Sequence, residues 1–149
     1  MILIVDNFLT IKECKEVIKI YHRDKHLAER SNRASILPGS RIKKILLRTQ
    51  GIAKKYFNPK ILIDWAELKK HEKDSFHSFH FDRGEDRTVL SSVIYLNTLS
   101  SGFTIFKDGT KVSPIAGRLL LFDGQKYLHG VSRSQKERYT IPIWYKLSS

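Results

Sequence analysis

The sequence feature that most constrains the fold is a dense succession of short apolar segments after residue 60. These segments are rich in β-branched and aromatic residues and are separated by Gly, Ser, Asp and Asn. They cover residues 60–68, 76–82, 88–97, 103–106, 118–122, 128–131 and 138–145. Short runs of this composition, bounded by turn residues, predict β-strands. So many strands at such close spacing predict a double-sheet sandwich or a barrel.

Two amphipathic helices are predicted ahead of these strands. Thr10 and Glu13 have the spacing of a capping box, and apolar residues then recur on one helical face over residues 11–22. The second helix is expected over about residues 42–58, because Pro59 cannot continue it. A short apolar run at residues 2–5 predicts one further strand. Helices followed by a run of strands indicate an α+β fold.

Length and composition predict a single globular domain over residues 1–149. Hydrophobic residues make up 41% of the chain and charged residues 28%, as in ordinary globular proteins. Cys14 is the only cysteine, so the chain cannot form an internal disulfide, which fits a reducing compartment. The first residues do not have the pattern of a signal peptide, and no run approaches the ~18 apolar residues of a membrane span. We therefore expect a cytoplasmic protein without a membrane partner.

The net charge of +12, from 27 Lys and Arg against 15 Asp and Glu, allows three interpretations. Clustered cations bind nucleic-acid phosphates. A positive field also attracts acidic substrates or cosubstrates. The third interpretation is a basic surface that is simply solvated. The basic residues are scattered, except in 41–48 and at 54–55, and this distribution favours no single nucleic-acid footprint.

The segment 76-FHSFHFDRGED-86 mixes aromatic residues with side chains that can bind metals. Residues two apart in a strand point to the same face, so His80 and Asp82 are expected on one face and Phe79 and Phe81 on the other. By the same alternation His77 is expected on the face opposite His80. We expect the phenylalanines to anchor the strand in the core while His80 and Asp82 face a cavity.

A metal site at His80 and Asp82 needs a third ligand from elsewhere in the chain. His129 is the candidate, because it is the only histidine after Asp82. Two imidazoles and one carboxylate leave open positions that suit non-haem Fe(II). Farther along, Arg138, Thr140 and Trp144 alternate onto one strand face. An arginine on a core-facing position requires an anion, since its buried charge must be compensated.

The motifs taken together resemble the catalytic core of the Fe(II)/2-oxoglutarate-dependent dioxygenases, in particular the prolyl 4-hydroxylase branch. The pieces are 80-HFD-82, 95-YLN-97, 102-GFTIF-106, 114-PIAG-117, 129-HGV-131 and 138-RYTIPIW-144. The stretch 5-VDNFLTIKECKEVIK-19 is similar to the opening strand and helix of that branch. The resemblance implies a double-stranded β-helix (jelly-roll) core with N-terminal supporting helices.

The resemblance also implies roles for individual residues. His80, Asp82 and His129 would hold Fe(II). Arg138, nine positions after His129 (138 − 129 = 9), would bind the distal carboxylate of the cosubstrate 2-oxoglutarate, and Tyr95 would donate a hydrogen bond to it. The resemblance also implies O₂ as a second cosubstrate. Thr140 and Trp144 would lie at the wall of the pocket.

Several positions depart from the family pattern, including Asp74 and 102-GF-103, where the branch usually has glycines. The branch usually has a tyrosine nine residues before the first iron-binding histidine, where this chain has His71. His71 either contacts the cosubstrate or substrate in the cavity, or lies at the surface. His77 stands where an aromatic residue is common. A helical conformation would bring His77 beside His80, as in a structural zinc site, but the flanking phenylalanines and the absence of a nearby cysteine argue against it.

These observations predict a 2-oxoglutarate- and Fe(II)-dependent dioxygenase that hydroxylates a C–H bond, with release of succinate and CO₂. The expected substrate is a peptidyl residue, with proline first by resemblance. One alternative is a nucleic-acid dealkylase, which the charge favours and the nine-residue spacing to Arg138 opposes. Another is a jelly-roll that binds a ligand without catalysis. The polar segment 23–40 is expected to be a long loop that closes over the substrate.

Overall fold

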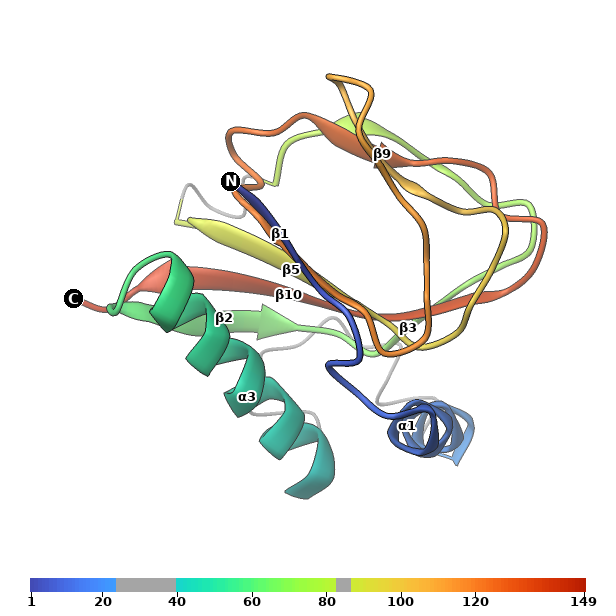
Figure 1. Ribbon diagram of the computed structural model, residues 1–149, viewed down its shortest axis with the longest axis horizontal. Coiled ribbons are helices and arrows are strands. Elements are labelled where there is room, and N and C mark those ends of the chain that lie inside the picture. Colours follow the sequence, from blue (N-terminus) through green and yellow to red (C-terminus); the bar gives the residue numbers. More distant parts are fainter. Residues whose placement is uncertain (24–39, 83–86) are drawn as a thin grey trace.

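The computed structural model describes residues 1–23, 40–82 and 87–149. Two antiparallel sheets pack against each other, and helices α1 (Ile11–Arg23) and α3 (Ser40–Tyr56) lie on the outer side of the larger one (Figure 1). This arrangement is the expected α+β architecture with a jelly-roll core. The segment predicted to close over the substrate lies between the two helices and falls outside the described residues.

The larger sheet has the order β1-β8-β5-β10-β2, with β3 also paired to β10. Its strands are β1 (Ile2–Val5), β8 (Leu119–Phe122), β5 (Leu90–Tyr95), β10 (Arg138–Leu147), β2 (Ile61–Ala66) and β3 (Lys69–His71). The smaller sheet has the order β4-β9-β6-β7. Its strands are β4 (His77–His80), β9 (His129–Val131), β6 (Thr104–Phe106) and β7 (Lys111–Val112).

The larger sheet is buried on both faces, which explains its continuous apolar runs. Its outer face packs under the helices, where Ile94 and Ile141 join Ile42 in one core cluster. Its inner face meets the smaller sheet, where Tyr95 and Phe122 join a second cluster. Neighbouring residues of one strand therefore serve opposite clusters, as the alternation of side chains along a strand requires.

The capping box predicted at the start of α1 is present. The Thr10 amide donates to Glu13 Oε1 at 3.0 Å, and the Glu13 amide donates to Thr10 Oγ1 at 3.1 Å. Glu13 also pairs with Arg48 at 3.5 Å, and Glu16 pairs with Arg41. The two acidic residues of α1 thus face two of the cations of α3 and fix the two helices relative to each other.

The predicted strands are confirmed, with ends that differ by a few residues. Strands β3 and β7 were not predicted, because segments of two or three residues are too short to show an alternating pattern. In the described part of the chain, neither helix is long and apolar enough to cross a membrane.

The prediction that phenylalanines anchor residues 76–82 in the core is wrong for Phe79, whereas Phe81 is half-buried. Phe79 is 47% exposed and Phe76 is 60% exposed. Strand β4 is an edge strand of the smaller sheet, and the helices cover only the larger sheet, so the outer face of β4 meets solvent. Each ring instead lies under a cation, with Lys107 Nζ 5.5 Å from the Phe79 centroid and Arg133 Cζ 5.1 Å from that of Phe76.

Gly51 lies in the middle of α3 on its exposed face, and a Cβ there would have no neighbouring atom within 4 Å. Alanine restricts the unfolded chain and favours helix, so Gly51→Ala should raise the free energy of unfolding by about 0.5–1 kcal/mol. Urea denaturation followed by circular dichroism measures this change. An unchanged or lowered urea midpoint would show that Gly51 does not destabilise the helix.

Candidate active site

A cavity of about 110 Å³ lies between the two sheets and is lined by residues from both. The larger sheet contributes alternate residues of β10, which confirms the predicted common face of Arg138, Thr140 and Trp144. The smaller sheet contributes His80 and His129, and Asp82 follows directly after β4. The residues predicted to bind a metal and those predicted to bind an anion are far apart in the sequence, yet they line the same cavity.

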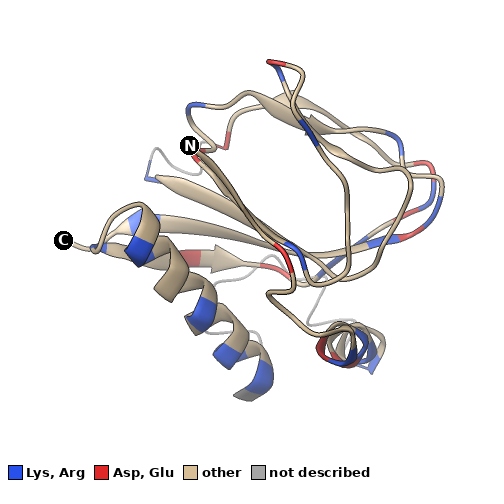
Figure 2. Ribbon diagram, viewed as in Figure 1, with Lys and Arg blue, Asp and Glu red and all other residues tan. Residues whose placement is uncertain are grey.

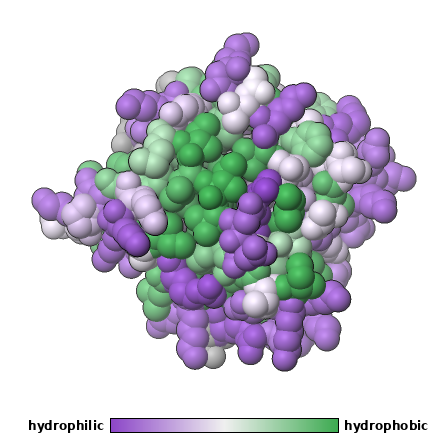
Figure 3. Space-filling view, in the orientation of Figure 1, coloured by the Kyte–Doolittle hydropathy of each residue, from purple (hydrophilic) through white to green (hydrophobic). Residues whose placement is uncertain are grey.

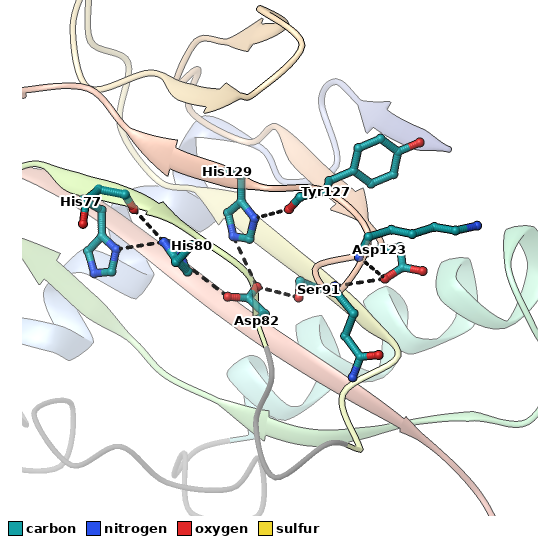
Figure 4. A network of polar contacts seen from close by, with 10 residues as sticks. His77, His80, Asp82, Ser91, Asp123, Tyr127 and His129 are labelled. Atoms are coloured by element: carbon teal, nitrogen blue, oxygen red, sulfur yellow. Dashed lines mark hydrogen bonds and ion pairs between the residues drawn. The ribbon is translucent and has the colours of Figure 1, made fainter.

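His80, Asp82 and His129 place one candidate ligand atom each within 4.8 Å of the others. His80 and His129 are direct cross-strand partners in β4 and β9. The carboxylate of Asp82 lies between them, with Oδ1 3.4 Å from His80 Nε2 and Oδ2 3.4 Å from His129 Nε2 (Figure 4). Two imidazoles and one carboxylate this close together form a donor set that suits non-haem Fe(II).

Both imidazoles are held in one orientation by the backbone. His80 Nδ1 lies 2.8 Å from the carbonyl of Ser78, and His129 Nδ1 lies 2.8 Å from the carbonyl of Tyr127. A carbonyl accepts only, so each Nδ1 donates to its carbonyl and each Nε2 is directed at Asp82. This is the arrangement by which proteins orient histidines toward a metal.

Asp82 is fixed and ionised. Ser91 Oγ donates to Asp82 Oδ2 at 2.7 Å, and the backbone amide of Asp82 donates to the Gly124 carbonyl at 2.9 Å. Gly124 has no space for a side chain, because a Cβ there would lie 2.3 Å from Ser91 Oγ. Burial alone would raise the pKa of Asp82, but hydrogen bonds from His129, His80 and Ser91 outweigh burial and lower the pKa below its usual value.

Arg138 is the buried cation of the cavity. It is 3% exposed, and its Nε has no hydrogen-bond partner in the described residues. Its guanidinium lies 5.5 Å from the centroid of the Tyr95 ring, and the Tyr95 hydroxyl lies 2.5 Å from Thr104 Oγ1. Burial lowers the pKa of Arg138 and raises the pKa of Tyr95, so the phenol stays protonated. A buried arginine with an unused donor fits an incoming carboxylate.

The sequence of residues 66–146 matches the model of the 2OG-Fe(II) oxygenase superfamily. The chain belongs to this superfamily. The donor set of His80, Asp82 and His129 fits the iron of such an oxygenase, and the unpartnered Arg138 fits its 2-oxoglutarate. Comparison with curated protein sequences finds no match.

Several solved structures have the same fold as this chain over nearly its whole length. A Pseudomonas putida prolyl-4-hydroxylase is 17% identical with a TM-score of 0.79, covering 99% of this chain and 93% of its own. A viral collagen prolyl hydroxylase from Paramecium bursaria Chlorella virus-1, in complex with 2OG, is 19% identical with a TM-score of 0.78, covering 99% and 96%. A Trichoplax adhaerens prolyl hydroxylase in complex with a hypoxia inducible factor peptide fragment is 19% identical with a TM-score of 0.75, covering 97% and 83%.

His71 of the oxygenase lies in the cavity rather than at the surface. It is the cross-strand partner of Arg138, and its Nε2 lies 3.4 Å from Thr140 Oγ1. Burial, together with the positive charge of Arg138, lowers the pKa of His71 to about 3. The imidazole is therefore neutral at pH 7 and can donate or accept one hydrogen bond beside the arginine.

The prediction that His77 faces away from His80 is wrong. Strand β4 carries a bulge: His77 and His80 are three positions apart, whereas their partners Val131 and His129 are two positions apart. The extra residue breaks the alternation and returns His77 to the cavity face. Its Nδ1 lies 3.4 Å from His80 Nδ1, and it lines the same cavity (Figure 4).

Two residues of the site were missed from the sequence. Ser91 holds Asp82, and Thr104 holds the hydroxyl of Tyr95. Ser91 has the same strand parity as Tyr95, and Thr104 stands inside the quoted motif 102-GFTIF-106. Alternation along the two strands was therefore a usable signal for both.

Proposed function

We propose that residues 1–149 form one domain that uses Fe(II) and 2-oxoglutarate to hydroxylate a C–H bond of a peptidyl residue, with proline as the first candidate. The observation that carries this proposal is the unpartnered Arg138 Nε in the cavity that also contains the three metal-binding side chains. A site for a metal alone needs no buried arginine, whereas a carboxylate cosubstrate beside the metal does.

In this proposal His80, Asp82 and His129 hold the iron. The backbone contacts at both Nδ1 atoms direct both Nε2 atoms toward Asp82. Ser91 keeps one carboxylate oxygen of Asp82 in place while the other remains free to bind. A site that is oriented in advance does not have to order three side chains when the metal binds.

Arg138 and Tyr95 hold the distal carboxylate of 2-oxoglutarate. The guanidinium supplies charge and a donor that no described residue uses, and the protonated phenol can donate a further hydrogen bond while Thr104 donates to it. Neutral His71 and Thr140 line the adjoining wall, and Trp144 excludes water from the same cavity. The bound cosubstrate is thereby oriented by groups on rigid strands.

Fe(II) and 2-oxoglutarate, when bound, supply the oxidising chemistry that uses O₂, releases succinate and CO₂ and places a hydroxyl group on the substrate. The contribution of the chain is to bind, to orient and to keep water out. His80 is the exposed member of the metal set, with 35% of its side chain accessible, against 13% for Asp82 and 8% for His129. The substrate should therefore approach from the side of His80 and His77.

A peptide substrate is favoured by what the similar folds act on. Two of the solved structures described above are named prolyl hydroxylases of collagen or of a hypoxia inducible factor, and one of them holds a peptide fragment. Mass spectrometry of proline-containing peptides incubated with the protein, Fe(II), ascorbate and 2-oxoglutarate tests the proposal. A product heavier by about 16 Da, formed only with the cosubstrate, is the expected result. Succinate formation that no peptide stimulates would contradict a peptide substrate.

Nucleic acid is not expected to be the substrate despite the net charge of +12. The most basic element, α3, packs on the outer face of the larger sheet, whereas the cavity lies on the inner face. An oligonucleotide attracted to this helix would not reach the metal site. Incubation with a methylated oligonucleotide at physiological salt should leave the methyl group in place, and its removal would contradict the proposal.

A further inference from the structure

Helix α3 carries a uniformly basic surface that the proposed catalysis does not use. Its sequence, SRIKKILLRTQGIAKKY, contains six Lys and Arg and no acidic residue. Figure 2 shows these cations along the outward side of the helix, and Figure 3 shows hydrophilic side chains gathered over the same region. Arg41 and Arg48 pair with Glu16 and Glu13 of α1.

The four lysines of α3 have no such partner. Within the described residues, no carboxylate lies within ion-pair distance of Lys43, Lys44, Lys54 or Lys55. Lys43 and Lys54, like Lys44 and Lys55, are eleven positions apart, which is about three helical turns or ~16 Å. The lysines therefore form two parallel pairs along the helix, with no carboxylate partner among the residues that the structure describes.

A hollow lies beside the helix, between α3 and residues 7–8. It has a volume of about 390 Å³ and is lined by Asn7, Phe8, Arg48, Gly51, Ile52 and Lys55, so two cations stand at an otherwise largely apolar wall. Gly51 keeps the floor open because it has no side chain. Arg48 is held at the edge, since it donates to the Phe8 carbonyl at 2.7 Å and lies 4.7 Å from the Phe8 ring centroid. Its side chain nevertheless remains 49% exposed.

We propose that this surface, formed by the four lysines and the hollow at Gly51, docks the phosphate backbone of a nucleic acid. A polymer with one negative charge at regular intervals matches cations of one sign that follow a rigid helix. Stable protein interfaces are instead built around clustered aromatic and apolar anchors, whereas this surface offers only the exposed Leu47 and, at the hollow, the partly buried Ile52 and the buried Phe8. The nucleic acid is a docking partner and not the substrate, because the surface and the cavity lie on opposite faces of the larger sheet.

Fluorescence anisotropy with a labelled 20-nucleotide oligouridylate RNA tests the proposal. The variant in which Lys43, Lys44, Lys54 and Lys55 are replaced by glutamine should bind at least about tenfold more weakly at 100 mM salt. Four lost phosphate contacts should also reduce the slope of log affinity against log salt by about 2.8, at roughly 0.7 per contact for single strands. A matched control replaces four exposed lysines elsewhere, Lys107, Lys111, Lys126 and Lys136, by glutamine and should change both quantities much less.

A second pair of variants tests the hollow itself. Gly51→Glu places a carboxylate one turn from both Arg48 and Lys55, where it favours the helix and opposes a phosphate. This variant should fold as well as the parent and bind the RNA several-fold more weakly, whereas Gly51→Gln should bind more strongly than Gly51→Glu. Circular dichroism reports the helix content of each variant.

Three results would overturn the proposal. No measurable RNA binding would remove it outright. Equal losses in the two four-lysine variants would show that net charge acts without a localised surface. Polyglutamate of matched length binding as tightly as the RNA, with the same sensitivity to the α3 variant, would assign the surface to an acidic protein. None of these outcomes depends on the oxygenase reaction, so they are independent of the proposed function.

Discussion

Alanine in place of Arg138 should weaken 2-oxoglutarate binding by roughly two to three orders of magnitude. The guanidinium is 3% exposed, and its Nε has no partner among the described residues. Removing one member of a buried charge pair costs about 3–5 kcal/mol, because the remaining charge stays desolvated. About 1.4 kcal/mol corresponds to a tenfold change in affinity, which gives the expected loss. Lysine should not restore the affinity, because it cannot form two parallel hydrogen bonds with a carboxylate.

Calorimetric titration of 2-oxoglutarate into the anaerobic Fe(II) or Mn(II) protein measures this effect. Tyr95→Phe removes one neutral donor and should cost about 1–3 kcal/mol, a smaller loss than that of Arg138→Ala. Arg133→Ala is the matched control, because it removes an exposed arginine outside the cavity. Metal affinity should be similar in all three variants. Wild-type affinity for 2-oxoglutarate in Arg138→Ala would mean that another residue binds the carboxylate, or that 2-oxoglutarate is not the cosubstrate.

Periodicity was sufficient to predict most of the fold, and the reasons are visible in the structure. Strand β10 directs Arg138, Thr140 and Trp144 toward the cavity, and this common face was predicted from the sequence; Ile141 and Ile143 join the core on the helix side. The segment 118–122 gave no alternation, because β8 is buried on both faces. Its composition alone identified it as a strand. The pairing order of the strands does not follow from such patterns, since each strand could pair with several others.

The predicted site failed where strand geometry departs from strict alternation. The bulge in β4 returns His77 to the face of His80, and nothing in the letters HSFH marks the position of the extra residue. The exposure of Phe79 depends on which sheet the helices cover, which is a property of the tertiary structure. His71 could not be assigned for a similar reason. Its burial results from the short strand β3, which places it beside Arg138.

Replacing any one of His80, Asp82 and His129 by alanine should abolish succinate formation. Among the described residues, each supplies one of the three candidate ligand atoms that lie within 4.8 Å of one another. The strand pairing of His80 with His129 is made by the backbone, so the side chains can be removed without loss of that pairing. Asp82 contributes the only negative charge of the set, and its loss would leave two neutral imidazoles to bind a dication. The fold should therefore survive while the metal affinity falls.

Ser91→Ala provides a graded comparison for these variants, because it removes only the hydrogen bond of 2.7 Å to Asp82 Oδ2. Loss of a group that orients a ligand typically costs 10–100-fold in metal affinity, so Ser91→Ala should fall in about that range and the three ligand variants beyond it. Titration of Mn(II) under anaerobic conditions measures the affinities without turnover, and circular dichroism reports the fold. A ligand variant that kept wild-type metal affinity and turnover would remove that residue from the site. Equal losses for Ser91→Ala and Asp82→Ala would mean that the metal senses the whole hydrogen-bond network rather than the carboxylate itself.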